Sequence, residues 1–280
     1  MEYQSLKHLV CLFCFFHFYI SVFGGEFFEL SLPITKDLTR ANLLYFSYEF
    51  NPEGILILAS GYNSDGTIIK KKEWIDFAKE NKLILVGLSF ASNVGDLQNG
   101  KGYYYVSKGS GKLLLDGLKQ IYSEAIPIYL YGFSGGAHFV ARFAEWAPDR
   151  VAGFCAYSAG WWDNPKLLKN APAGIIACGE NDERLGASMS FFLHGRKLNR
   201  KWVWVKIPSV GHAHSLELDD FVRSFFKYIL EKKPTQNDYW VDISNGEIIS
   251  KNRSGFKTAL TSYLPCKKFL KAWKELNGIQ

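Results

Sequence analysis

Short, continuous apolar runs recur along this sequence and are separated by segments in which apolar residues have helical spacing. The run 54–60 (GILILAS) is apolar at nearly every position, which is typical of a strand buried on both faces of a sheet. Such strands in alternation with helices favour a mostly parallel sheet that carries helices on both faces. The predicted strands are 27–32, 42–50, 54–60, 83–88, 126–131, 151–157, 174–178 and 202–207, and the predicted helices are 68–81, 112–125, 137–146, 184–198 and 215–230.

The fold class that follows is α/β. Right-handed connections between parallel strands leave a doubly wound sheet or a closed barrel, and the serine segment described below favours the doubly wound sheet. The 280 residues are 48% hydrophobic, which suits one large domain, predicted over 26–231. A linker-like sequence after Glu231 begins a C-terminal extension, 232–280. Within it, Asn245-Gly246 favours a hairpin over 239–249, residues 264–276 suit a short helix, and we expect both to pack on the main domain.

The N-terminus has a different composition from the rest of the chain. Lys7 precedes an apolar run over 9–20, and small residues follow it at Gly24 and Gly25. This order is that of a secretory signal peptide, predicted over 1–24, and the run is short for a membrane span, which needs about 20 apolar residues. The prediction is a secreted or periplasmic protein that has no membrane contact once the signal is cleaved. An uncleaved N-terminal anchor is the alternative.

The net charge of +6 comes from basic residues that are scattered along the chain. The densest runs, 70–72 and 232–233, are short enough to belong to a solvated surface. A nucleic-acid interface would need a basic stripe on one face, so no nucleic-acid partner is expected.

The segment 132–136 (GFSGG) lies between a predicted strand and a predicted helix. A serine on such a sharp turn, here Ser134, has its hydroxyl exposed, and the glycines two residues to either side prevent clashes at the turn. The start of the following helix offers free backbone N–H groups to a developing negative charge. The segment therefore predicts a nucleophilic serine.

A nucleophilic serine needs a base, and the base needs a carboxylate that orients it. In this type of site, the acid and then the histidine follow the serine along the chain, each beyond the end of a later strand. Asp182 follows strand 174–178, and His212 follows strand 202–207, so these two are the predicted acid and base. His214 is the rival base, and Glu180 and Glu183 are rival acids.

The sequence predicts two backbone N–H groups as donors to an oxyanion. The first is the N–H of Gly135, directly after the serine, and the second is the N–H of Tyr62, in the turn 60–66 after strand 54–60.

Taken together, the serine segment and the Ser134, Asp182, His212 order resemble the α/β-hydrolase superfamily over roughly residues 27–231. Within it, the chain is most similar to secreted esterases related to feruloyl esterases, polyhydroxyalkanoate depolymerases and dienelactone hydrolases. The resemblance implies hydrolysis of carboxylic esters through an acyl-enzyme, with no metal and no organic cofactor. One departure is Ser60-Gly61 at the oxyanion turn, where many relatives have His-Gly.

The substrate is predicted only by its class, a small-molecule or polymeric ester. The stretch between strands 151–157 and 174–178 is short, so we expect little or no cap domain over the site. Trp161, Trp162 and Tyr104 lie in loops on the predicted side of the site, where aromatic rings stack on sugars or phenols or simply pack within the loops. Two other functions remain open: a serine peptidase of the prolyl-oligopeptidase type, for whose propeller there is no room, and a non-catalytic binding protein. The sequence leaves the oligomeric state open.

Overall fold

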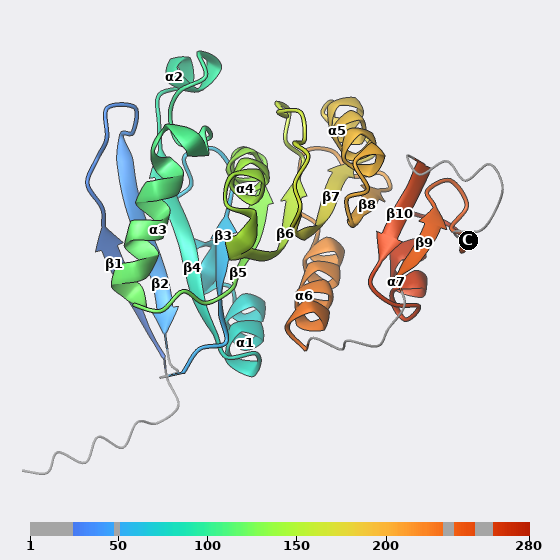
Figure 1. The fold of residues 1–280 in the computed structure, drawn as a ribbon, viewed down its shortest axis with the longest axis horizontal. Coiled ribbons are helices and arrows are strands. Elements are labelled where there is room, and N and C mark those ends of the chain that lie inside the picture. Colours follow the sequence, from blue (N-terminus) through green and yellow to red (C-terminus); the bar gives the residue numbers. More distant parts are fainter. Residues whose placement is uncertain (1–24, 48–50, 232–237, 250–259) are drawn as a thin grey trace, which may run out of the picture.

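The computed structural model describes residues 25–47, 51–231, 238–249 and 260–280, so the predicted signal peptide lies outside the described residues. Its centre is an eight-stranded sheet, with the strands in the order β1-β2-β4-β3-β5-β6-β7-β8 (Figure 1). The strands are β1 (Glu26–Ser31), β2 (Arg40–Ser47), β3 (Gly54–Ala59), β4 (Leu83–Ala91), β5 (Ile128–Phe133), β6 (Val151–Tyr157), β7 (Ala173–Gly179) and β8 (Trp202–Ile207).

The sheet is parallel from β4 to β8, whereas β2 pairs antiparallel with both β1 and β4. The predicted α/β class with a mostly parallel, doubly wound sheet is therefore confirmed. After β3 the chain first adds β4 on one side and then β5 on the other. This reversal opens a crevice at the carboxyl ends of β3 and β5, which is where open α/β sheets bind their ligands.

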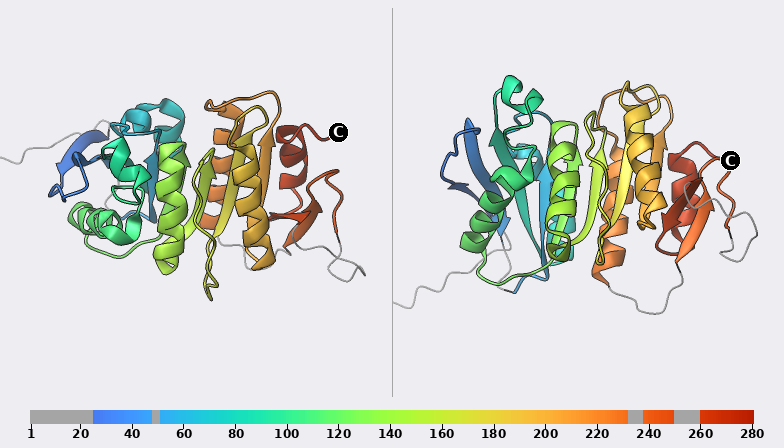
Figure 2. Two further views of the ribbon diagram at one scale, coloured as in Figure 1. Left: turned by 90° about the horizontal axis from the view of Figure 1, so that it is seen from above. Right: turned by 45° about the horizontal axis from the view of Figure 1, so that its top comes forward.

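Helices cover both faces of the sheet (Figure 2). On one face lie α3 (Ser110–Ile121), α4 (Gly135–Trp146) and α5 (Leu185–Lys197), and on the other lie α1 (Lys72–Glu80) and α6 (Leu216–Leu230). Each face has its own apolar core, because side chains of the fully buried strands alternate between the two layers. The shorter helices are α2 (Val94–Gln98) and the 3₁₀ turns Thr67–Lys70, Val106–Lys108 and Pro148–Arg150.

Helix α6 illustrates how local sequence sets these elements. The Ser215 hydroxyl caps the helix by accepting a hydrogen bond from the Leu218 N–H at 3.1 Å, and Glu217 adds a negative charge in the first turn. Phe221 and Phe225, four residues apart, are then buried against the sheet. Burial of each ring contributes about 1.5–3 kcal/mol.

The C-terminal segment lies beside β8 and consists of β9 (Tyr239–Asp242), β10 (Thr261–Leu264) and α7 (Phe269–Leu276). The predicted hairpin is only partly formed: Val241 makes a single bridge to Ile248, but the longer antiparallel ladder joins β9 to β10. The predicted final helix starts five residues later than expected, because residues up to Leu264 are in β10. The pairing of β9 is non-local, and the turn sequence alone does not indicate it.

Side chains of this segment cover the outer edge of β8. The Ser262 hydroxyl accepts from the Trp204 N–H at 2.9 Å, and the Trp273 indole N–H donates to the Trp204 carbonyl at 2.7 Å. The Asn277 side-chain oxygen accepts from the Lys206 N–H at 2.8 Å. These bonds satisfy backbone groups that an open edge strand would present to another chain.

Residues 158–172 contain no helix and no strand, although this stretch is described without a gap. The expectation of little or no cap over the carboxyl ends of the strands is met there. None of the helices in the described part of the chain is long and apolar enough to cross a membrane.

Candidate active site

Ser134 occupies the sharp turn between β5 and α4. Its φ of 52° and ψ of −116° lie outside the regions that non-glycine residues prefer, and such a conformation costs on the order of 1–3 kcal/mol. The two flanking glycines permit the turn. A Cβ on Gly132 would lie 2.6 Å from the Gly136 carbonyl oxygen, and one on Gly136 would lie 1.8 Å from the Ala59 carbonyl oxygen. Helix α4 therefore starts in direct backbone contact with the end of β3.

The structure brings the three residues of the predicted triad together. His212 Nε2 lies 2.8 Å from Ser134 Oγ, and His212 Nδ1 lies 2.7 Å from Asp182 Oδ2. An ionised Asp182 can only accept, so the proton of the neutral imidazole is on Nδ1, and Nε2 accepts from the serine hydroxyl. This arrangement can take up the proton of Ser134 as its oxygen attacks an electrophile.

Asp182 has a fully buried side chain, and both of its oxygens are hydrogen-bonded. Oδ1 accepts from the Arg184 N–H and from the Arg184 guanidinium, each at 3.0 Å. Burial raises the pKa of Asp182, but the hydrogen bonds from His212, Arg184 and Ser158 lower it, and the resulting pKa is about 2. The carboxylate is therefore ionised at neutral pH.

Backbone contacts hold the loops of the acid and the base against each other. The Asn181 N–H donates to the Val210 carbonyl at 2.8 Å. The rival acid Glu180 also joins these segments, since its carboxylate pairs with Lys206 at 2.5 Å and accepts from the Ser209 N–H at 3.1 Å. The other rival, Glu183, has an exposed side chain that pairs with the Arg184 guanidinium at 3.1 Å.

The rival base His214 packs on the Phe133 ring, with 4.1 Å between ring centroids. Burial, with smaller contributions from Lys71 and His212, lowers its pKa to about 4. His214 is therefore neutral at pH 7, and it shares the Phe133 ring with His212, which is the histidine that bonds to the serine.

The two predicted oxyanion donors lie side by side. A Cβ on Gly135 would be only 2.7 Å from both the N and the Cα atoms of Tyr62. Gly135 is the first residue of α4, so its N–H has no acceptor within the helix. Both N–H groups are thus available at the start of the helix, where the dipole favours negative charge.

The turn that contains Tyr62 is tied to the end of β4 by Ser92. The Asn63 side chain accepts from the Ser92 N–H and donates to the Ser92 carbonyl, both at 3.1 Å. The Tyr62 hydroxyl also donates to that carbonyl at 3.0 Å. The Ser92 hydroxyl accepts from the Tyr103 N–H at 3.0 Å, so one residue joins the loop after β3 to the loop after β4. We define Ser92 and these partners as the Ser92 clamp.

The three aromatic residues predicted to line the site differ in exposure. Trp161 is 47% exposed, whereas Tyr104 is only 4% exposed. Trp162 stacks on Phe191, with 4.3 Å between centroids. Of these three rings, Trp161 is thus the one most available to a ligand by its exposure.

The sequence analysis missed His138, a buried histidine one helical turn after Ser134 on α4. Its ring stacks on Tyr104, at 4.6 Å and 20°, and its Nδ1 lies 2.9 Å from the Trp161 carbonyl oxygen. Burial, with a smaller contribution from the nearby Arg142, lowers its pKa to about 4, so the ring is neutral at pH 7. A histidine four residues after the serine, on a helix that is otherwise apolar there, was the available signal.

Known structures resemble this chain over most of its length. No family model and no curated protein sequence matches it. A fluorophosphonate-binding serine hydrolase of Staphylococcus aureus shares 16% identity and superposes with a TM-score of 0.54, covering 74% of this chain and 98% of its own. A poly(3-hydroxybutyrate) depolymerase from Bordetella parapertussis shares 16% identity with a TM-score of 0.57, covering 72% of this chain and 89% of its own. A ferulic acid esterase shares 14% identity with a TM-score of 0.54, covering 75% of this chain and 97% of its own. The chain has the α/β-hydrolase fold.

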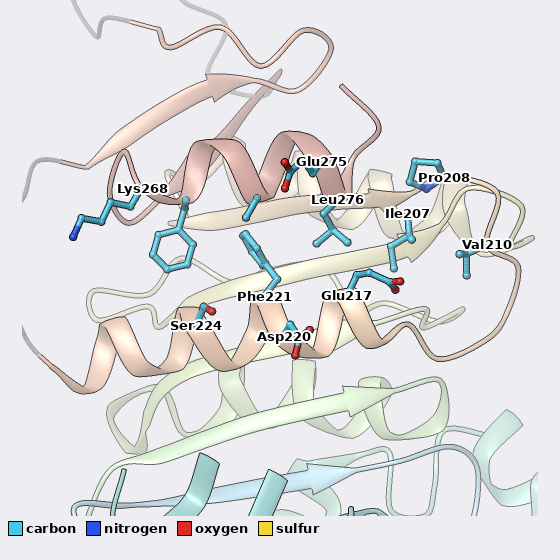
Figure 3. A pocket seen from close by; sticks show the side chains of 12 residues that line it. Ile207, Pro208, Val210, Glu217, Asp220, Phe221, Ser224, Lys268, Glu275 and Leu276 are labelled. Atoms are coloured by element: carbon cyan, nitrogen blue, oxygen red, sulfur yellow. The ribbon is translucent and has the colours of Figure 1, made fainter. Parts of the chain in front are cut away.

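Two hollows lie in the surface of this α/β-hydrolase fold. One, of about 450 Å³, lies beside Trp161 and Arg142 and extends to His194 on α5. The other, of about 640 Å³, lies between α6 and α7, with Phe221 and Leu276 among its apolar lining residues (Figure 3). No triad residue lines either hollow, but the first is lined by Trp161, whose carbonyl oxygen accepts from His138 on the helix that starts at Ser134.

Proposed function

We propose that this protein is a serine hydrolase that cleaves carboxylic esters through an acyl-enzyme, with Ser134 as the nucleophile. The observation that carries the proposal is the unbroken hydrogen-bonded series from Ser134 through His212 to Asp182. Each residue follows the carboxyl end of a different strand of one rigid sheet. Such a site is preorganised, because the sheet holds all three side chains before a substrate arrives.

The reaction follows from the positions of the groups. Ser134 Oγ attacks the ester carbonyl carbon while His212 Nε2 takes the hydroxyl proton, and the carbonyl oxygen becomes an oxyanion. The N–H groups of Gly135 and Tyr62 stabilise that oxyanion. Collapse of the tetrahedral intermediate breaks the bond to the alcohol, which leaves with the proton from His212. Water then repeats these steps on the acyl-enzyme and releases the acid and free Ser134.

Asp182 acts in this scheme by holding and stabilising His212. Its pKa of about 2 keeps it ionised, so it keeps the proton of neutral His212 on Nδ1 and stabilises the imidazolium that forms in each step. The buried Asp182 carboxylate is itself held by Arg184.

The substrate we propose is a bulky or polymeric ester, of plant-wall or polymer origin, met outside the cell. The absence of helix and strand in residues 158–172 supports a bulky substrate, because this stretch does not form a cap domain over the site. Structures named as a ferulic acid esterase and a poly(3-hydroxybutyrate) depolymerase resemble this chain, which supports that class. The location outside the cell rests on the signal-like composition of residues 1–24.

A fluorophosphonate probe tests the nucleophile. Folded wild-type protein should be labelled, Ser134→Ala should not, and Ser123→Ala should be labelled like wild type, since Ser123 is exposed in a loop after α3. Wild-type protein without Ser134-dependent labelling would refute the proposal and favour a non-catalytic binding protein.

A substrate comparison then tests the reaction. Short nitrophenyl esters should be hydrolysed and peptide anilides should not, and the reverse result would assign a serine peptidase instead. Feruloyl, acetyl-sugar and hydroxyalkanoate esters, compared by kcat/KM, would next identify the acyl and alcohol groups.

A further inference from the structure

Tyr104 brings a side-chain hydroxyl to the place where the two backbone donors meet. Its oxygen lies 2.7 Å from the point that a Cβ on Gly135 would occupy, and the Tyr62 nitrogen lies 2.7 Å from the same point. The hydroxyl of Tyr104, the N of Tyr62 and the first residue of α4 therefore surround one small volume. The Tyr104 hydroxyl thus lies close to both backbone groups.

We propose that the Tyr104 hydroxyl is a third donor to the oxyanion, beside the N–H groups of Gly135 and Tyr62. This inference rests on the proposed ester hydrolysis. It changes the oxyanion site from one made by the backbone alone to one that also depends on a side chain from the loop after β4. A donor aimed in advance at the developing charge stabilises the transition state more than the substrate.

Burial determines the protonation state of the Tyr104 hydroxyl. It raises the pKa of Tyr104 above the ordinary value for tyrosine. The hydroxyl of the neighbouring Tyr103 accepts from the Asn63 N–H at 3.2 Å. Burial keeps the hydroxyl protonated, and therefore a donor, across the neutral range.

The ring of Tyr104 is held in place by residues on both sides. It stacks on His138, at 4.6 Å and 20°, and meets Tyr103 edge to face, at 4.7 Å and 72°. Since His138 is on α4, the helix that starts at the serine turn also fixes this hydroxyl. The His138 Nδ1–H donates to the Trp161 carbonyl, which holds the imidazole against the Tyr104 ring. His138 is thus a positioning residue in this arrangement.

The test compares Tyr104→Phe with a matched control, Tyr129→Phe. Both changes remove one hydroxyl from a buried tyrosine, but Tyr129 is near the opposite end of β5 from Ser134. With a nitrophenyl ester, Tyr104→Phe should lower kcat by about 10²-fold with little change in KM, as expected for the loss of one oxyanion donor. Tyr129→Phe should keep the wild-type kcat.

A second measurement separates a donor from a structural role. An alkyl trifluoromethyl ketone forms a hemiketal with the serine, and its oxyanion needs the same donors as the transition state does. Its affinity should fall in Tyr104→Phe by about the same factor as kcat/KM, with an unchanged urea unfolding midpoint. Unchanged kcat in Tyr104→Phe, or lowered kcat with wild-type affinity for the ketone, would overturn the inference. Wild-type protein that neither turns over esters nor reacts with fluorophosphonate would instead refute the proposed function.

Discussion

The contact between the serine turn and β3 makes Gly136→Ala the most informative stability variant. The added Cβ would be 1.8 Å from the Ala59 carbonyl oxygen, whereas ordinary contacts begin at 3.4 Å, and the atoms nearest to it belong to the backbone of Ala59 and Ser60. No side chain can rotate away, so the start of α4 must move from β3 by about 1.5 Å. Overpacking of this kind costs about 3 kcal/mol or more, and the better helix propensity of alanine returns at most about 1 kcal/mol.

Gly186→Ala is the matched control, because Gly186 is also the second residue of its helix, α5, and a Cβ there meets nothing within 4 Å. Urea unfolding should place Gly136→Ala about 2 kcal/mol or more below wild type, and Gly186→Ala at or slightly above it. Gly136→Ala should also lower ester turnover by about 10²-fold, because the Gly135 N–H moves relative to Tyr62. If the two variants unfold at the same urea concentration, the close approach of α4 to β3 is refuted.

Three further variants test other parts of the structure. His138→Gln should weaken the dependence of the unfolding free energy on acid pH. In wild type, the stability contributed by neutral His138 is complete above pH 6.5. On the order of 3 kcal/mol of it is lost as the pH falls from 6.5 to about 4, because the unfolded chain takes up the proton first. Urea denaturation at several pH values should show a smaller change of unfolding free energy with pH in His138→Gln than in the control His194→Gln, whose histidine is exposed. Equal changes in the two variants would contradict this role of His138. Trp273 is fully buried, so Trp273→Ala should lower the unfolding free energy by about 3–5 kcal/mol. Trp161 is half-exposed, so Trp161→Ala should lower the unfolding free energy by much less in the same denaturation assay. Asp182→Asn should reduce kcat on a nitrophenyl ester by about 10⁴-fold through loss of the orienting carboxylate, and near-wild-type turnover would argue against that role.

The sheet and the serine turn were predictable because their signals are local. A fully apolar strand such as β3 and the GFSGG turn each carry their pattern within a few residues, and the order Ser134, Asp182, His212 needs only the count of strands between them. The prediction of element types therefore succeeded across the main sheet, with ends shifted by a few residues.

The remaining features depend on contacts between distant segments. The Ser92 clamp joins residues 29 to 30 positions apart, namely Tyr62 and Asn63 with Ser92, and no periodicity indicates such a bond. The same holds for β9, whose turn sequence favours a hairpin although most of its pairing is with β10. The contact of Arg184 with Asp182 is likewise recognisable only in the fold, whereas for His138 the sequence offers its spacing from Ser134 but not its contact with Tyr104.

The Ser92 clamp also limits how this protein could acquire a new substrate preference. An insertion in the turn after β3 or in the loop after β4 would pull on Ser92 and so shift the groups around the oxyanion. Residues 158–172 carry Trp161 at the rim of the site and contain no regular element to disrupt. Divergence within such a lineage, or laboratory evolution for a different ester, should therefore accumulate length changes in 158–172 and leave the two clamped loops at constant length.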